Sequence, residues 1–419
     1  MPESNLDVLI FGGGVAGLWL LDRLRRSGIG SALVETKALG EGQTIAAQGI
    51  LHSGLKYTLD GQLSASARAA REMPLIWRTC LAGHTEPDLS PVRLRSEHCH
   101  LWRTDSLRSR LGMFGARLGL HVTPEVVARN DRPQALRSCP GTVARLDEQV
   151  LSPASLLSVL ADRNRAHLLE IEPRCEFRRG YARQWQVDVK SRLGDHGRLH
   201  ARVIVFAAGA GNAILRSQVG LATATMQRRP LHMVLARGDL PELNGHCVDG
   251  ARTRVTITSD QDAQGRRVWQ IGGHIAEMGV EHDPAQLVQL AQQEIRAVLP
   301  GIDLSGTEWA TQRVDRAEQA TADGSRPHAI GVLCEGNVIT AWPTKLVLAP
   351  QLADTVREQL AQFGVMGIEG REDDESSQLI TSVTPTEFAD WPRPAVADYP
   401  WDRPIAWLPY EPHVRRKAA

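Results

Sequence analysis

Three glycines near the start of the chain have the spacing of a phosphate-binding turn. Gly12, Gly14 and Gly17 form a G-x-G-x-x-G pattern. The first glycine of such a pattern allows a tight turn, the second lets backbone amides approach a pyrophosphate, and the third lets a helix pack closely against a strand. Glu35 follows roughly 20 residues later, at the position where an acid can bind both hydroxyls of a ribose. These residue types together predict a dinucleotide-binding site.

The segments around these glycines have the composition that would position them. Residues 6–11 form a short apolar run, which is typical of a strand buried on both faces of a parallel sheet. Leucines recur at helical spacing after Gly17, and residues 31–35 have the pattern of a second strand that ends at Glu35. A strand, a glycine turn, a helix, a second strand and an acid predict a βαβ unit, which could bind either NAD or FAD.

The next segment favours FAD. A turn-rich stretch at residues 40–44 precedes Ile-Leu-His-Ser-Gly-Leu-Lys-Tyr at residues 50–57. Here the sequence resembles the D-amino-acid-oxidase-type family of FAD enzymes, in patches between roughly residues 5 and 360. Within that family the segment is similar to the Leu-His-Gly-Gly-Leu-Arg-Tyr of glycerol-3-phosphate dehydrogenases and the Ile-His-Ala-Gly-Ile-Tyr-Tyr of L-2-hydroxyglutarate oxidases. His52, Gly54 and Tyr57 occupy matching positions, whereas Ser53 and Lys56 depart from the first pattern and leave the substrate open.

The resemblance implies an α/β fold of two domains. One is a Rossmann-like FAD-binding domain built from discontinuous segments, and the other is an antiparallel-sheet substrate domain. A Pro/Trp-rich C-terminal extension follows them. The expected boundaries are residues 1–80, 145–222 and 325–365 for the FAD-binding domain, 81–144 and 223–324 for the substrate domain, and 366–419 for the extension.

Three later segments are expected to complete the cofactor site. Residues 168–177 have the pattern of a strand, and the resemblance places Cys175 against adenine. The apolar run at 201–212 and the turn at 336–346 resemble the family's later flavin-contacting strands. The residues expected to contact the cofactor are Gly12, Gly14, Val15, Ala16, Gly17, Glu35, Thr36, Lys37, Thr44, Ala47, Gln48, His52, Cys175, Ala208, Gly209, Pro343, Thr344, Lys345 and Leu346.

The residues expected at the reacting centre come from the same resemblance. His52, Arg313 and Lys345 are the candidate catalytic residues, and a histidine near neutral pKa can accept a hydroxyl proton as a hydride leaves. The planar fork of Arg313 suits a carboxylate or phosphate, although an ion pair with Asp315 or Glu318 would be an ordinary surface role for it. The candidate substrate-binding residues are Tyr57, His232, His274 and Arg313. For His232 and His274, a structural role in a strand is the simpler alternative.

The expected reaction is hydride transfer to flavin from a small anion, either a 2-hydroxy acid or a glycerol 3-phosphate-like molecule. Three alternatives stay open: an amine or amino-acid oxidase, a flavin enzyme acting on RNA, and a non-catalytic flavin-bearing interaction protein. Lys+Arg and Asp+Glu are both 48, so the formal net charge is zero, which argues against a nucleic-acid partner. The electron acceptor, whether oxygen, a quinone or a protein, is not specified by the sequence.

The remaining features predict a reduced intracellular protein without a metal. Six scattered cysteines are too few for a disulfide framework in 419 residues. Glu97-His98-Cys99-His100 lacks a second ligand pair at zinc spacing, so we expect a strand there and no metal. No transmembrane segment is expected. The expected location is cytoplasmic, with peripheral association at a membrane as the alternative, and the extension is expected to dock on the protein itself or on a partner.

Overall fold

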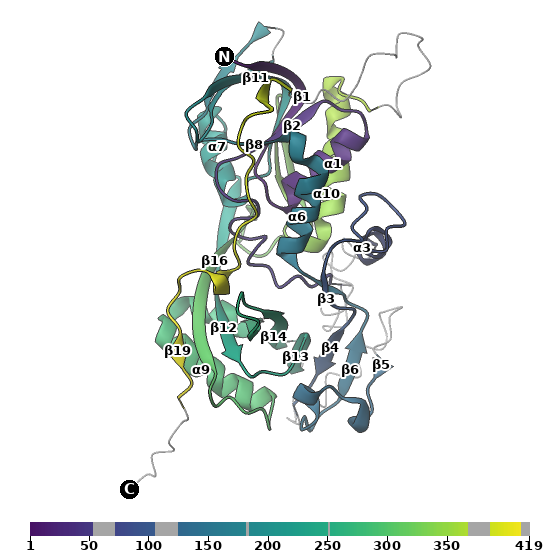
Figure 1. Cartoon of the computed structure of the whole chain (residues 1–419), viewed down its shortest axis with the longest axis vertical. Helices are drawn as coiled ribbons and strands as arrows, with labels where there is room; N and C mark the ends of the chain where they lie inside the picture. Colours follow the sequence, from purple (N-terminus) through teal and green to yellow (C-terminus); the bar gives the residue numbers. More distant parts are fainter. Residues whose placement is uncertain (53–71, 105–124, 182–183, 250–251, 368–385, 412–419) are drawn as a thin grey trace.

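The computed structural model describes residues 1–52, 72–104, 125–181, 184–249, 252–367 and 386–411. These residues form two stacked lobes, each built on one large β-sheet, with the longest axis running through both (Figure 1). Tyr57 and Gly54, which the sequence places in the flavin-facing segment, lie outside the described residues.

The first sheet has the parallel core that the glycine pattern predicts. Its strand order is β17 (Gly331–Glu335), β18 (Val338–Trp342), β11 (His196–Phe206), β1 (Glu3–Phe11), β2 (Ser31–Glu35) and β8 (Leu168–Glu170). The neighbours from β18 to β8 pair in parallel, and β17 pairs antiparallel at the edge. β10 (Trp185–Lys190) and β9 (Glu176–Arg179) extend β11 as an antiparallel meander. β1 is central because its apolar run is buried on both faces.

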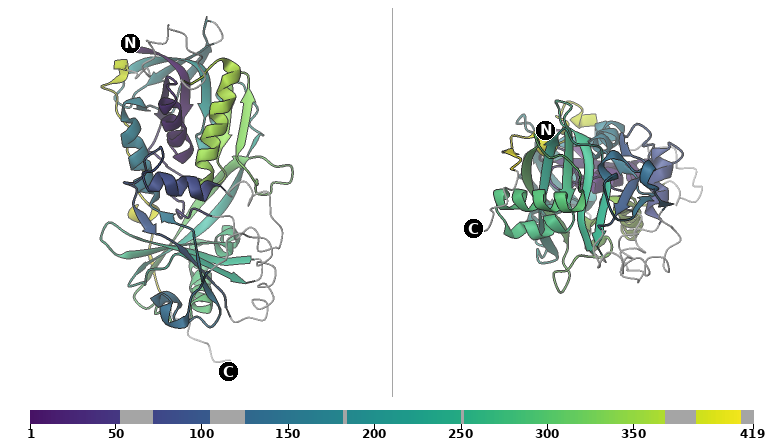
Figure 2. Two further views of the ribbon diagram at one scale, coloured as in Figure 1. Left: turned by 90° about the vertical axis from the view of Figure 1, so that its right-hand side faces the viewer. Right: turned by 90° about the horizontal axis from the view of Figure 1, so that it is seen from below.

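Three helices cover one face of this sheet. α1 (Val15–Arg26), α6 (Pro153–Asn164) and α10 (Ala349–Leu360) lie side by side in Figure 2, left. α6 begins where the Ser152 hydroxyl accepts a hydrogen bond from the Ser155 backbone N–H at 3.3 Å, as expected for a serine before a proline-started helix. α3 (Met73–Leu81) packs at their lower end, and α7 (Asn212–Gln218) follows β11.

The second sheet is antiparallel except at one pair. Its order is β19 (Leu408–Pro409), β16 (Glu308–Gln319), β12 (Met226–Gly238), β15 (Arg267–Gly272), β14 (Arg252–Gln261), β13 (Gly245–Asp249), β4 (Cys99–Trp102), β6 (Val143–Leu146) and β5 (Glu125–Val126). Only β13 and β4 run parallel among the pairs of this sheet that the structure describes. A separate two-stranded sheet joins β3 (Leu94–Ser96) to β7 (Val150–Leu151).

The two faces of the second sheet have different chemistry. Val234, Ile257 and Ile271 point to one face and form a core with α9 (Pro284–Val298), which lies across the sheet in Figure 2, right. α8 (His274–Met278) follows β15. Residues one position along the same strands point the other way, toward the first lobe, because side chains alternate along a strand. That second face carries the polar residues described below.

Two strand predictions need correction. The strand expected over residues 168–177 ends at Glu170, and the next strand, β9, begins at Glu176. Pro173 lies between them and has no N–H with which to continue a ladder. Of the strand expected at residues 97–100, only Cys99 and His100 lie in a strand, β4, and Glu97 and His98 lie in the gap after β3. The rings of His98 and His100 still meet edge-to-face with centroids 5.0 Å apart.

The C-terminal segment 386–411 runs down the length of both lobes (Figure 1, yellow). Phe388 and Trp391 join the core on the far face of the first sheet, and Trp401 joins a cluster on the second. Its last described strand, β19, pairs with β16. Among the described residues, no helix is both long and apolar enough to cross a bilayer.

Candidate functional site

A cavity of about 1410 Å³ lies between the two lobes. Its walls come from the first sheet's strand ends, from the loop at residues 41–52, and from the polar face of the second sheet. Ligand sites of α/β proteins typically lie at the carboxyl ends of parallel strands, which is where β1, β2 and β11 end here. This cavity is therefore the candidate active site.

The three motif glycines have separate physical jobs. Gly12 has a φ of 108°, and a Cβ there would lie 2.4 Å from Ala208 Cα, so only glycine fits. A Cβ on Gly17 would lie 1.9 Å from the Gly12 carbonyl oxygen. Gly17 does not line the cavity, and it serves the site by allowing α1 to approach the turn. Gly14 is different, since a Cβ there would meet only Thr44 Oγ1, at 3.1 Å.

Glu35 is held at the cavity edge by backbone amides. Its Oε2 accepts a hydrogen bond from Gly13 N at 2.6 Å, and its Oε1 accepts from Thr36 N at 2.7 Å and Lys37 N at 3.0 Å. These bonds fix the carboxylate at the end of β2, next to the N-terminus of α1. This is the placement that ribose binding requires.

The loop at residues 40–50 is attached to the second lobe. Gln48 Nε2 donates to the backbone carbonyls of Thr256 at 3.0 Å and Gln270 at 2.9 Å. Gln270 Nε2 donates in return to the Ala46 carbonyl at 2.6 Å. Thr44 Oγ1 accepts from Val15 N at 3.2 Å, so one loop joins the glycine turn to the polar face of the second sheet.

The opposite wall contains a residue in an unusual backbone conformation. Among the described residues, Thr344 is the one non-glycine with a positive φ, 61°, and its hydroxyl donates to the Ala329 carbonyl at 2.6 Å. Such a conformation is costly for a β-branched residue and tends to occur at functional sites. Lys345 beside it is buried, with 8 % of its surface exposed. Asn212 steadies the neighbouring turn, because its Oδ1 accepts from Ala208 N at 2.8 Å.

The cavity residues fit a dinucleotide. Eighteen of the nineteen residues expected to contact the cofactor line this cavity, and the exception is Gly17. Cys175 lies beside Pro173 in the wall near Glu35, and burial raises the pKa of its thiol to about 12, so a neutral group faces this end. Bare backbone at Gly14 leaves room for phosphates at the α1 N-terminus, where the first N–H groups of the helix favour an anion.

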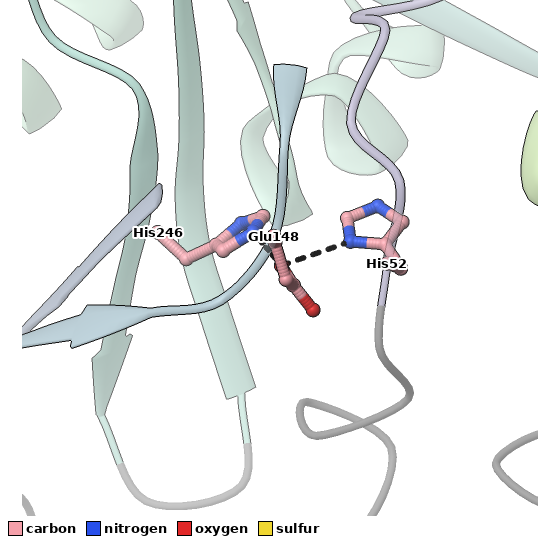
Figure 3. A group of neighbouring side chains, drawn as sticks. All are labelled: His52, Glu148 and His246. Atoms are coloured by element: carbon pink, nitrogen blue, oxygen red, sulfur yellow. Dashed lines mark hydrogen bonds and ion pairs between the residues drawn. The ribbon is translucent and has the colours of Figure 1, made fainter. Parts of the chain in front are cut away.

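His52 forms a polar trio with two buried residues, Glu148 and His246 (Figure 3). Its Nδ1 lies 3.4 Å from Glu148 Oε2, and His246 Nε2 lies 3.5 Å from the same oxygen. Glu148 comes from the turn between β6 and β7, and His246 from β13. Burial alone would raise the pKa of Glu148, but the hydrogen bonds and charges of His246 and His52 outweigh it and hold that pKa well below the usual range.

Two residues expected to bind substrate have other contacts. His232 is buried, its Nδ1 lies 2.9 Å from the Gly279 carbonyl oxygen, and it does not line the cavity. It points to the helix-covered face of the sheet, so the structure gives it a packing role instead. Arg313 touches the cavity, but its guanidinium donates to the carbonyls of Val280 and His282 at 3.1–3.2 Å. His274 lines the cavity as expected.

Arg316 is a cation that sequence reasoning missed. It lies on the cavity face of β16, with 20 % of its side chain exposed, and the nearest acid oxygen described is that of Glu277, 3.5 Å away. Burial lowers the pKa of Arg316, and the neighbouring Arg229 acts in the same direction. Arg229 itself is paired with the buried Glu318 at 2.7 and 2.9 Å. Arg316 therefore offers charge to the cavity more readily than Arg229.

A parallel sheet with a glycine turn, joined to a second sheet across a long cavity, defines a dinucleotide-dependent oxidoreductase fold. A family model described as FAD dependent oxidoreductase matches residues 7–338. The probable FAD-dependent oxidoreductase PA4991 of Pseudomonas aeruginosa is 38% identical over 414 residues, which are 96% of this chain and 99% of that protein. The chain belongs to the family of FAD-dependent oxidoreductases, whose cofactor is FAD.

Solved structures show the same fold. The crystal structure of the Pseudomonas aeruginosa protein matches with a TM-score of 0.77 at 36% identity, over 96% of this chain and 99% of that one. Glycine oxidase from Geobacillus kaustophilus matches with a TM-score of 0.60 at 18% identity, over 85% and 95%. L-alpha-glycerophosphate oxidase from Mycoplasma pneumoniae, solved with FAD bound, matches with a TM-score of 0.58 at 12% identity, over 87% and 96%.

Proposed function

We propose that the protein oxidises a small anion at a carbon that bears a hydroxyl group, as in a 2-hydroxy acid or a glycerol 3-phosphate-like molecule. The bound cofactor supplies the hydride acceptor. The carrying observation is His52, which lines the cavity and is supported from behind by the buried carboxylate of Glu148. An alcohol must lose its O–H proton as its C–H bond breaks, and it therefore needs a base of this kind.

The residues divide the work as follows. The substrate hydroxyl proton goes to His52, the carbon–oxygen double bond forms, and the hydride leaves with the C–H electron pair. Arg316 supports binding of a carboxylate or phosphate on the substrate, because its guanidinium is half-buried in the same cavity. Arg313 and Lys345, the cations expected from the sequence, stay candidates for this role.

The amine alternative is kept because several neighbours of this fold have amino-acid names, such as glycine oxidase. At such low identity these neighbours do not choose a substrate for this chain. A neutral amine already has the lone pair that drives hydride loss, so it makes a weaker demand for a base than an alcohol does. His52 with its buried carboxylate favours the alcohol.

The test is bleaching of the flavin under anaerobic conditions. We expect 2-hydroxyglutarate or glycerol 3-phosphate to bleach it, and proline and sarcosine to leave it yellow. His52→Ala should keep FAD bound and slow bleaching by roughly 100-fold or more, the usual scale for a lost general base. Bleaching by sarcosine or proline alone would contradict the proposal and favour an amine oxidase. If none of the four bleaches the flavin, the non-catalytic alternative gains support.

A matched pair of variants tests the anion contact. Arg316→Met should raise KM by roughly 10- to 150-fold with FAD content unchanged, which corresponds to the about 1.5–3 kcal/mol of a hydrogen bond to a charged group. Arg313→Met removes the same charge from the same strand and should have the smaller effect, because its guanidinium is already bound to carbonyls. A larger rise in KM for Arg313→Met than for Arg316→Met would instead favour Arg313 as the residue that contacts the anion.

A further inference from the structure

Three distant segments bring His52, Glu148 and His246 together (Figure 3), and His52 is the member of the three that lines the cavity. Glu148 is 1 % exposed and His246 is fully buried, whereas 17 % of the His52 side chain is exposed. Their ligand-type atoms all lie within 4.8 Å of one another, and the two imidazole rings have centroids 5.4 Å apart. Buried ionisable side chains are expensive in a fold, so their convergence at the site requires an explanation.

Charge balance gives the first step. A carboxylate removed from water is stable only when a nearby positive charge and hydrogen bonds compensate it. Two imidazoles face Glu148, and one bound proton shared with this acid would make the group electrically neutral as a whole. A second imidazolium would instead leave a net positive charge in a buried place. Charge balance therefore favours a resting trio that holds one proton beyond its two neutral imidazoles and its carboxylate.

The contacts of each ring decide where that proton lies. His246 has a partner on each side, because Nε2 faces Glu148 and Nδ1 lies 2.9 Å from Thr256 Oγ1. A hydroxyl can accept a hydrogen bond, so a charged His246 has an acceptor for its Nδ1–H in Thr256 and an ion-pair partner for its Nε2–H in Glu148, 3.5 Å away. His52 turns its Nδ1 to Glu148 while its ring lines the cavity, so a neutral His52 presents Nε2 as an acceptor.

We propose that Glu148 and His246 are positioning residues that keep His52 neutral and oriented as the proton acceptor at the flavin cavity. This inference rests on the proposed alcohol oxidation. Glu148 accepts from Nδ1–H of His52, which fixes the tautomer with Nε2 toward the substrate, and His246 carries the positive charge that balances Glu148. When Nε2 takes the hydroxyl proton, the new imidazolium lies 3.4 Å from the carboxylate that stabilises it.

The observed distances suit this role. Hydrogen bonds of this type normally measure about 2.7–3.2 Å, and the two bonds to Glu148 are longer, at 3.4 and 3.5 Å. Catalytic hydrogen bonds are often long before substrate binds and shorten in the reacting complex. The series of contacts His52–Glu148–His246–Thr256 begins and ends at residues that line the cavity. A bound substrate can therefore contact the series at either end.

The test follows the titration of His52 in the oxidised, FAD-loaded protein by NMR of ¹⁵N-labelled histidine, with the His52 signal assigned by its loss in His52→Ala. Glu148→Gln removes the carboxylate, so the His52 midpoint should fall by at least about one pH unit. His246→Gln removes the balancing charge, so the midpoint should rise by a similar amount. Glu148→Asp keeps the charge and is the conservative control, with a midpoint close to that of the wild type. Yellow colour and FAD content show that each variant is folded and loaded.

The same variants are then compared in flavin reduction by 2-hydroxyglutarate or glycerol 3-phosphate across pH. The pH at which the rate falls to half on the acid side should be lower than in the wild type for Glu148→Gln and higher for His246→Gln. A merely structural role would not move the two in opposite directions. Equal or same-sign NMR shifts overturn the proposal, and so does a divalent metal that co-purifies in stoichiometric amount and whose removal by a chelator shifts the His52 signal. If the NMR shifts are found while neither substrate bleaches the flavin, the trio stands and the proposed reaction fails.

Discussion

The motif glycines differ in whether the surrounding protein leaves space for a side chain. Gly12 and Gly17 are fixed by backbone atoms at 2.4 and 1.9 Å from a hypothetical Cβ, so a side chain there disrupts the fold itself. Gly14 has an ordinary φ of −76° and only the Thr44 hydroxyl nearby. Its requirement for glycine therefore comes from the cofactor.

The first prediction separates these two requirements. Gly14→Val should fold with near-wild-type thermal stability in the absence of FAD and should be colourless, because the added methyl groups occupy the place of the pyrophosphate. Gly17→Ala should lose about 3 kcal/mol or more of unfolding free energy from overpacking. Urea unfolding of the two variants, each freed of FAD, compares their stabilities. Absorbance at the flavin wavelengths, measured on the proteins as purified, compares their FAD content. A yellow Gly14→Val protein would contradict this account.

The second prediction concerns pH. His167 is buried and its Nδ1 lies 2.8 Å from the Ser31 carbonyl oxygen, and burial lowers the pKa of His167 to about 4. Its ordinary value is about 6.5, so the unfolded chain binds a proton between these values and the folded protein does not. Stability is therefore complete above about pH 6.5 and falls by an amount on the order of 3 kcal/mol as the pH drops to about 4. Thermal melts from pH 7 to 4 measure this loss.

His167→Gln is the control for that prediction. Glutamine can still donate to the Ser31 carbonyl but does not titrate, so its stability should depend less on pH over the same interval. His100, whose pKa burial also lowers to about 4, is unchanged in this variant and should account for part of the remaining dependence. An identical pH slope in the variant and the wild type would remove His167 as the cause.

Sequence reasoning located most of the cavity wall but only part of its chemistry. The glycine turn, Glu35 and His52 could be predicted because a local pattern marks each of them. Glu148 and His246 have no such pattern: each is one polar residue in an unremarkable segment, and only tertiary pairing brings them to His52. Arg316 was missed in favour of Arg313 because the facing of a strand residue depends on which side of the sheet the helices cover.

At the scale of elements, helix starts were the most predictable feature. Asp283 caps α9, its side chain accepts from Gln286 N at 2.9 Å, and Gln286 Oε1 accepts from Asp283 N at 3.3 Å, which completes a capping box. Strand ends were less predictable, since β8 stops at Glu170, three residues before Pro173, within the segment 168–177 that was expected to be one strand. Helix caps are local signals, whereas strand ends depend on partners elsewhere in the chain.

The third prediction follows from this cap. Asp283→Ala should reduce the unfolding free energy by about 1 kcal/mol, because the first turn of α9 loses its acceptor. Asp239→Ala removes an equal charge from an exposed residue outside any helix and should change stability by less than about 0.5 kcal/mol. Chemical denaturation of both variants in parallel gives the comparison. Equal losses would mean that charge rather than capping is responsible.

At the scale of the whole molecule, the C-terminal segment joins the lobes and reaches the cavity. Tyr399 OH lies 2.7 Å from Ser152 Oγ at the start of α6. On the second sheet, the guanidinium carbon of Arg237 lies over the Trp407 ring, 3.9 Å from its centroid. Arg403 pairs with both oxygens of Glu41, at 3.0 and 2.9 Å, and both residues line the cavity. The segment is therefore tied to the loop that begins at Glu41 and forms part of the cavity wall.

The fourth prediction measures that contact. Arg403→Ala and Glu41→Ala should each raise the FAD dissociation constant by up to about 5-fold, since a half-exposed ion pair is worth about 0.2–1 kcal/mol. The double variant should be no worse than either single one, which a double-mutant cycle on FAD binding would reveal. Arg145→Ala breaks an exposed pair with Glu125 far along the second sheet and should leave FAD affinity unchanged. Additive losses would mean that the two residues act independently.

The position of β1 in the first sheet has a consequence for folding during synthesis. β1 lies between β2 and β11, and β11 in turn pairs with β18, which ends at Trp342. A ribosome adds about 5–20 residues per second, so β18 is complete roughly 15–70 s after β1. Arg403, which lines the same cavity, is made later still. The glycine turn is thus synthesised well before the later segments that complete the cavity, so FAD can find its full binding site only after those segments have joined the sheet and the cavity wall.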